Sequence, residues 1–153
     1  MAVETYNMDA SVLRSASRAA DILQIVDLWV QIGDAPIPSP SRQDIETRRI
    51  LMRGLDYLVC RDDATRKIIG AVSIVDYKDS LAGISSLVVA PRYQSRGHGR
   101  GLMVSALDLC RQKKYQEVTA LATPASQELL TSLGFETNEW YRSGNAAMSL
   151  DLS

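Results

Sequence analysis

Apolar and polar residues repeat along the chain at two spacings, one helical and one extended. Apolar side chains recur three and four positions apart over 18–32 and again over 102–114, which predicts two amphipathic helices. Short runs rich in Val, Ile and Tyr, joined by brief polar turns, predict strands paired as antiparallel hairpins at 57–61, 67–77 and 81–90. The other expected elements are a strand at 11–14, a helix from 40 to 54, a strand at 117–122, a helix at 125–133 and one or two closing strands within 135–152.

The order of these elements predicts the fold class. The helix at 102–114 connects the strand at 84–90 to the strand at 117–122. Such a crossover is right-handed and joins parallel strands, so we expect these two strands to be parallel neighbours. Proline suits neither a helix interior nor a central strand, so the segment 34–40 must be a loop. We therefore predict an α+β protein, one domain over 1–153, with a mixed, mostly antiparallel central sheet flanked by helices.

Composition and charge narrow the function classes. The net charge of −1 gives no reason to expect a nucleic acid or a membrane surface as partner. No apolar run approaches about 18 residues, and the first residues do not resemble a secretory signal, so we expect a cytoplasmic protein. Cys60 and Cys110 lie within apolar patterns and are expected to be buried thiols. One histidine and two distant cysteines do not suit a structural zinc site, so no metal is expected.

A glycine-rich turn lies between the strand that ends near 90 and the helix that follows. It reads Gln94-Ser-Arg-Gly-His-Gly-Arg-Gly101. Glycines let the backbone approach a ligand closely, and the N–H groups at a helix N-terminus favour an anion. The turn is not a Walker A loop, because no lysine follows its last glycine, and its glycine spacing does not fit the dinucleotide fingerprint. The segment predicts a phosphate or pyrophosphate site, and a glycine-rich connection without a ligand is the alternative.

The same residues resemble a family signature. Gln94-Ser-Arg-Gly-His-Gly99 is similar to the Gln/Arg-x-x-Gly-x-Gly/Ala signature of the GNAT superfamily of acyl-CoA-dependent N-acyltransferases. Leu87-Val-Val-Ala-Pro91 resembles the end of that family's fourth strand, and Leu133-Gly-Phe135 resembles the segment that closes its last helix. Leu13-Arg-Ser-Ala16 is similar to the family's opening, so the resemblance covers nearly the whole chain. It implies a GNAT-like fold with a splayed pair of parallel strands at the cofactor site.

The resemblance also implies a binding mode for acetyl-CoA. The pantetheine arm would lie between the splayed strands and pair with the main chain of Leu87 and Val89, and the pyrophosphate would accept N–H groups from Arg96 through Gly101. His98 is the only histidine. Because it lies inside this loop, we expect it to donate to a phosphate or to face solvent rather than act as a base. The candidate cofactor-binding residues are Leu87, Val88, Val89, Gln94, Ser95, Arg96, Gly97, His98, Gly99, Arg100 and Gly101.

The chain departs from the family pattern at two catalytic positions. Ser85 and Ser86 stand where many members carry a glutamate base on the fourth strand, and Leu130 stands where many carry a tyrosine acid. A serine hydroxyl is not a base at neutral pH, so Ser85 or Ser86 could serve only by holding a water. Four further candidates come from loops, and one lies on a helix: Asp34, Tyr77, Glu139, Tyr141 and, on the helix, Ser126.

Two function classes remain open on the sequence. The first is an N-acetyltransferase that moves an acetyl group from acetyl-CoA to a small-molecule or protein amine, with Asp34, Trp140 and Tyr141 as candidate acceptor contacts. The second is a catalytically degenerate GNAT protein that binds acyl-CoA as a sensor or regulatory partner. The closing strand could also pair across a homodimer.

Overall fold

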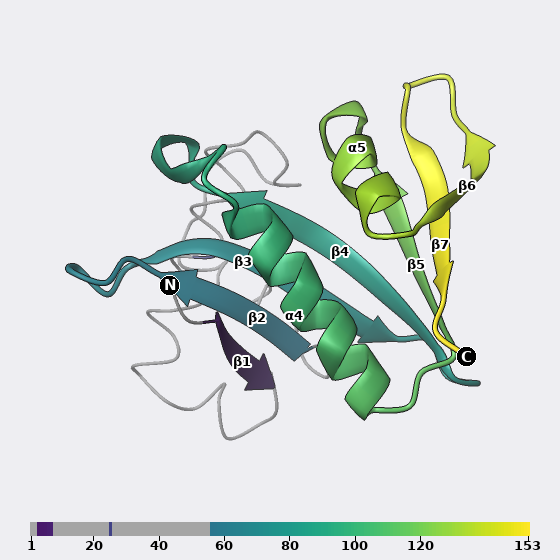
Figure 1. The fold of residues 1–153 in the computed structure, drawn as a ribbon, viewed down its shortest axis with the longest axis horizontal. Helices are drawn as coiled ribbons and strands as arrows, with labels where there is room; N and C mark the ends of the chain where they lie inside the picture. Colours follow the sequence, from purple (N-terminus) through teal and green to yellow (C-terminus); the bar gives the residue numbers. More distant parts are fainter. Residues whose placement is uncertain (1–2, 8–24, 26–55) are drawn as a thin grey trace, which may run out of the picture.

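The computed structural model describes residues 3–7, 25 and 56–153 (Figure 1). The strands of this part of the chain form one seven-stranded sheet in the order β1-β2-β3-β4-β5-β7-β6. The strands are β1 Val3–Asn7, β2 Asp56–Arg61, β3 Ile68–Asp76, β4 Leu81–Val89, β5 Glu117–Ala122, β6 Glu136–Trp140 and β7 Ala146–Asp151. The helices are the short 3₁₀ helix η1 Pro91–Tyr93, α4 His98–Gln112 and α5 Pro124–Ser132.

The predicted fold class is confirmed. β4 and β5 are parallel neighbours joined by α4, and the other adjacent strand pairs are antiparallel. The strand β1 was not predicted, because five residues of alternating pattern at a chain start give a weak signal. The elements predicted at 11–14, 34–40 and 40–54 lie outside the described residues. Of the helix predicted at 18–32 only Ile25 is described, and it is helical and buried. No helix in the described part of the chain has the length and apolar character needed to cross a membrane.

α4 lies across one face of the sheet over β2, β3 and β4 (Figure 1). Its apolar residues recur every three or four positions, which places them on one side of the helix. This side is fully buried: it consists of Leu102, Met103, Ala106, Leu107 and Cys110. Burying each of the larger side chains stabilises the fold by about 1.5–3 kcal/mol, so this packing fixes the start of α4 relative to β4. Cys60 and Cys110 are buried, as predicted, and burial raises the pKa of the Cys60 thiol.

A β-bulge bends β4 at the point where it leaves β5. Ser86 and Leu87 together lie opposite a single residue of β3, Val72, because the register shifts between their flanking pairs. The parallel pairing with β5 covers only Leu81–Ile84 and Glu117–Ala120. Since a bulge bends its strand and increases the local twist, β4 diverges from β5 beyond these pairs. The gap predicted from the family resemblance is therefore present.

The Leu-Gly-Phe segment ends α5 as the sequence predicted. Gly134 has a φ of 98°, a left-handed conformation that suits glycine. Its N–H donates to the carbonyl of Thr131 at 3.0 Å, and the N–H of Phe135 donates to that of Leu130 at 3.1 Å. Phe135 is 3% exposed. This buried end anchors α5 beside β5, on the far side of the gap from β4.

Candidate active site

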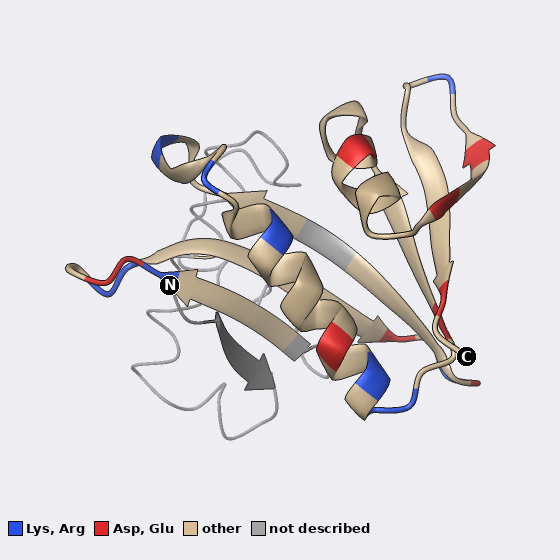
Figure 2. Ribbon diagram, viewed as in Figure 1, with Lys and Arg blue, Asp and Glu red and all other residues tan. Residues whose placement is uncertain are grey.

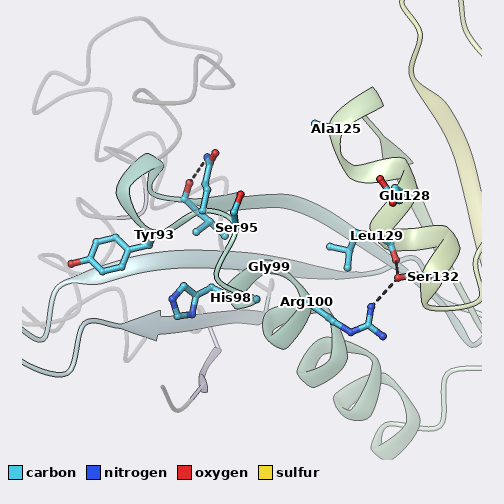
Figure 3. A pocket seen from close by; sticks show the side chains of 12 residues that line it. Tyr93, Ser95, His98, Gly99, Arg100, Ala125, Glu128, Leu129 and Ser132 are labelled. Carbon is cyan, nitrogen blue, oxygen red and sulfur yellow. Dashed lines mark hydrogen bonds between the residues drawn. The ribbon is translucent and has the colours of Figure 1, made fainter.

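Two hollows meet where β4, α4 and α5 approach one another. One has a volume of about 500 Å³ and lies between the diverging strands β4 and β5. The other has a volume of about 630 Å³ and lies between the start of α4 and α5 (Figure 3). Residues that line both hollows are Val89, Gln94, Ser95, Ala125 and Leu129. The two hollows therefore form one channel, which runs from the gap in the sheet to the N-terminus of α4.

The walls of the gap are mostly apolar. They come from the end of β4, the end of β5 and one side of α5, with Met103 of α4 among the lining residues. Leu130 is one of them and is 4% exposed, so the position expected for a tyrosine acid is occupied by a buried aliphatic side chain. The described lining residues contain no Asp, Glu, His, Cys, Tyr, Lys or Arg. Hydroxyl groups come from Ser95, Thr123 and Ser126.

The main chain of β4 presents hydrogen-bonding groups to the gap. The N–H of Ala90 donates to the carbonyl of Ile69 on β3 at 2.7 Å. Main-chain groups alternate in direction along a regular strand, so those of Val89 face away from β3, toward the gap. The side-chain amide of Gln94 donates to the carbonyl oxygen of Val89 at 3.0 Å, so this oxygen accepts a hydrogen bond from outside the sheet. Val89 thus has the orientation that the family resemblance implied for pairing with a pantetheine arm. Leu87 lies in the bulge, and its orientation stays a prediction.

The helix begins earlier than predicted. α4 starts at His98, with Gly97 as N-cap at a φ of 84°, so the residues expected in the glycine-rich turn up to Gly101 form the first helical turn. The prediction of a start at Leu102 was wrong because glycine lowers helix propensity, whereas packing of the apolar side of α4 holds this turn helical. The N–H of Gly101 donates to the carbonyl of Gly97 at 3.0 Å and is therefore occupied. The N–H groups of 98–100 have no acceptor within the helix.

This first turn suits an anion. The helix dipole gives its N-terminus a partial positive charge, and the turn contains no acidic residue. A Cβ on Gly99 would lie 3.8 Å from Val89 Cγ2 and 3.9 Å from Leu129 Cδ2. Gly99 therefore lies at the junction of the two hollows, and the absence of a side chain keeps that junction open.

Basic side chains surround the start of α4. Figure 2 shows Lys and Arg on η1, on the following loop and on α4, whereas α5 and β6 carry acidic residues. Arg100 Nη1 donates to Ser132 Oγ at 2.9 Å, and this hydroxyl donates to the carbonyl of Leu129 at 2.6 Å (Figure 3). Arg100 is thus held beside the hollow that it lines. Arg111 pairs with Asp108 at 3.3 Å on the exposed side of α4, as expected of a surface residue.

A hydrogen bond that the sequence did not reveal holds the loop before α4. Tyr93 Oη donates to Asp62 Oδ2 at 2.6 Å, which joins η1 to the turn between β2 and β3. The tyrosine hydrogen bond, followed by a backbone N–H from Thr65, lowers the pKa of Asp62 to about 2, and the same bond raises the pKa of Tyr93. The Arg96 guanidinium carbon lies 5.7 Å from the centre of the Tyr93 ring, and the His98 ring centre lies 6.3 Å from it.

The structure separates the catalytic candidates by position. Ser85 lies opposite Ser73 of β3 in the strand register, and Ser86 lies in the bulge where β4 turns from β5. Ser126 lines the gap from the first turn of α5, and its hydroxyl donates to the carbonyl of Thr123 at 3.1 Å. Among the described residues, no group of three or more His, Cys, Asp or Glu side chains is placed to hold a metal ion.

The acceptor candidates lie away from the gap lining. Trp140 is 63% exposed and Tyr141 is 45% exposed at the end of β6, and neither lines the channel. Tyr141 Oη is 3.5 Å from Glu139 Oε2. Tyr77 is also exposed and lies against Gly83 on β4. Asp34 lies outside the described residues.

Comparison with known proteins decides the family. The sequence model of the acetyltransferase (GNAT) family matches residues 22–135. The chain belongs to this family. Members of the GNAT family are acyltransferases. No curated protein sequence matches the chain.

Solved structures with the same fold are distant in sequence. A ribosomal-protein-alanine N-acetyltransferase from Brucella melitensis has a TM-score of 0.75 and 18% identity over 99% of this chain and 100% of its own. A phosphinothricin acetyltransferase from Sinorhizobium meliloti, solved with AcCoA, has a TM-score of 0.70 and 20% identity over 100% of this chain and 90% of its own. A Mycobacterium tuberculosis protein solved with CoA has a TM-score of 0.71 and 17% identity over 88% of this chain and 96% of its own. At these sequence identities the similarity shows a common fold alone.

Proposed function

We propose that this GNAT protein transfers an acetyl group from acetyl-CoA to a primary amine by direct attack. The observation that carries the proposal is the continuous channel from the gap between β4 and β5 to the free N–H groups at the start of α4. The chemical groups of acetyl-CoA follow the same order as the features of the channel: a thioester, an extended amide-containing arm and an anionic pyrophosphate. Related folds solved with CoA or AcCoA support the same ligand class.

Each part of the cofactor has a counterpart in the channel. The pyrophosphate accepts N–H groups of 98–100, with Arg100 beside it. The pantetheine amides pair with the main chain of Leu87 and Val89, and one of them replaces the Gln94 amide at the Val89 carbonyl. The thioester then lies near the bulge at Ser86, between strands that no longer pair.

The reaction requires two proton movements. An alkylammonium with a pKa of about 10 must first lose a proton. The amine nitrogen then attacks the thioester carbonyl carbon, the C–S bond breaks, and the departing thiolate accepts a proton. We assign the first task to a water held by Ser85 or Ser86. Ser126 lies one helical turn before Leu130, so its hydroxyl, once it releases the carbonyl of Thr123, is placed along α5 to donate to the sulfur.

The acceptor amine approaches from the side of the sheet opposite α4 and α5. Leu121 is 63% exposed, lines the gap and shares a cross-strand row with Ala147 of β7 and Glu139 of β6. Residues in such a row project on the same face of a sheet. Glu139 is therefore a partner for an ammonium group. Trp140 and Tyr141 provide aromatic surface at the end of β6, and Asp34 is the remaining proposed acceptor contact.

One observation favours a second candidate function. The described lining of the gap has no titratable side chain, which suits a GNAT protein that binds acyl-CoA without catalysis, as a sensor. A thiol-release assay with acetyl-CoA and a panel of small amines and peptides distinguishes the two. Release that depends on both acetyl-CoA and an amine supports the transferase. Saturable acetyl-CoA binding with no release for any amine supports the sensor.

A further inference from the structure

The loop between β4 and α4 is tied to a distant turn through Tyr93. The tyrosine lies in η1, and its hydroxyl donates to Asp62 Oδ2 at 2.6 Å across 31 positions in the chain. Tyr93 projects from the loop on the side away from α5 (Figure 3). Tyr93 is one of the residues that line the hollow at the start of α4, and its hydroxyl is bound by Asp62 and not directed toward α5.

The carboxylate that accepts this hydrogen bond is itself fixed. Asp62 Oδ1 accepts the backbone N–H groups of Ala64 and Thr65, each at 2.9 Å. The turn is closed by two main-chain bonds, from Arg66 N–H to the carbonyl of Asp62 at 2.8 Å and from the N–H of Asp62 to the carbonyl of Lys67 at 2.9 Å. Oδ2 is thus presented to the tyrosine by a turn whose own hydrogen bonds hold the carboxylate in place.

The segment that Tyr93 supports has a backbone that needs support. Ser95 has a φ of 62° and Gly97 a φ of 84°, both in the left-handed region. A non-glycine residue in that region persists where its surroundings hold it. The Arg96 guanidinium lies 5.7 Å from the centre of the Tyr93 ring, within the range of a cation–π contact, and the ring of His98 lies 6.3 Å from it. The position of the tyrosine ring therefore sets the position of the residues at the start of α4.

We propose that Tyr93, held by Asp62, is a positioning residue that shapes the loop before α4 for the cofactor's pyrophosphate. This inference rests on the proposed function, because it assumes that an acyl-CoA occupies the channel. The pair acts on the phosphate end alone. The gap between β4 and β5 is shaped by the bulge and by α5, which Tyr93 does not hold.

The test compares two ligands in three variants: Tyr93→Phe, Asp62→Asn and the double variant. CoA carries the pyrophosphate, and S-acetylpantetheine keeps the thioester and the amide arm but has no phosphate. Each single variant should bind CoA about tenfold more weakly, which corresponds to the loss of one hydrogen bond to a charged group. The double variant should be no weaker than either single variant, since both remove the same bond. Binding of S-acetylpantetheine should stay at the wild-type level in all three.

Controls separate this role from general damage. Tyr115→Phe removes a tyrosine hydroxyl beyond the other end of α4 and should leave CoA affinity unchanged. Wild-type CoA affinity in Tyr93→Phe, or additive losses in the double variant, would overturn the proposal. An equal loss for both ligands would also overturn it, because it would mean that the channel as a whole had changed. A wild-type protein that binds no CoA would instead overturn the proposed function.

Discussion

A single methyl group at Gly99 should separate the stability of the fold from its affinity for acetyl-CoA. In Gly99→Ala the new Cβ lies 3.8 Å from Val89 Cγ2 and 3.9 Å from Leu129 Cδ2, which are ordinary contact distances. The fold therefore accepts the methyl without rearrangement. Alanine is favoured over glycine inside a helix by about 1 kcal/mol, and less near a helix end. We expect the free energy of unfolding to stay constant or rise by up to about 1 kcal/mol.

The affinity should change in the opposite direction. The methyl occupies the junction of the two hollows, where the ligand passes from the gap to the N-terminus of α4. Loss of one charge-assisted hydrogen bond there costs about 1.5–3 kcal/mol, or roughly 10- to 100-fold in the dissociation constant. In Gly99→Asp a carboxylate about 4 Å from a phosphate adds a repulsion of up to about 4 kcal/mol at an effective dielectric constant of about 20. Binding should then be undetectable.

Calorimetric titration with acetyl-CoA and urea unfolding of the same samples measure both quantities. Gly101→Ala is the matched control, because a Cβ there meets nothing within 4 Å and lies in the same helical turn. It should gain stability in the same way and keep wild-type affinity. The reasoning is refuted if Gly99→Ala binds acetyl-CoA as tightly as the wild type, or if both alanine variants lose affinity equally.

Three further predictions concern the chemistry, the acceptor and acid stability. Leu130→Ala should lose about 2–5 kcal/mol of stability because the side chain is buried. Leu130→Tyr adds a hydroxyl and should shift one limb of the pH–rate profile, and an unchanged profile would mean that protonation of the leaving sulfur does not limit the rate. Trp140→Ala and Tyr141→Ala should change KM or kcat for the amine while acetyl-CoA affinity stays within about threefold, and a tenfold weaker acetyl-CoA affinity with unchanged amine kinetics would place the acceptor site elsewhere. The pKa of Asp62 is about 2 in the folded protein, below the unfolded value of about 3.9, so its contribution to stability is present above pH 4 and lost as the pH falls from about 4 to 2. Urea unfolding should show that the free energy of unfolding of Asp62→Asn falls less over this pH range than that of the wild type, and an equal fall in both proteins would mean that Asp62 does not contribute to the acid sensitivity.

The strand order around the site could be predicted because it depends on local patterns. The helix between the strands at 84–90 and 117–122 made them parallel neighbours, and the structure confirms that pairing. The direction of the Val89 main chain followed from the family resemblance, and the hydrogen bond of Ala90 to β3 supports it. The strand pairing depends on periodicity and on the order of elements, which a sequence displays directly.

Other features depend on contacts that a sequence does not display. The helix begins at His98 and not at Leu102, because the buried side of α4 outweighs the low propensity of its glycines. The bond between Tyr93 and Asp62 joins residues 31 positions apart, and no local pattern marks it. The bulge at Ser86 depends on the register with β3, which is set by pairing along the whole strand.

Mapping acetyl-CoA onto the backbone by amide NMR tests the central claim most directly. The account predicts saturable binding, with the largest chemical-shift changes at Leu87, Val89 and 98–100, which line the two ends of the channel. Binding would also stabilise the fold by about 2.7 kcal/mol when the ligand is at 100 times its dissociation constant. No saturable binding, or shift changes confined to the separate hollow beside Glu117 and Glu136, would contradict the account.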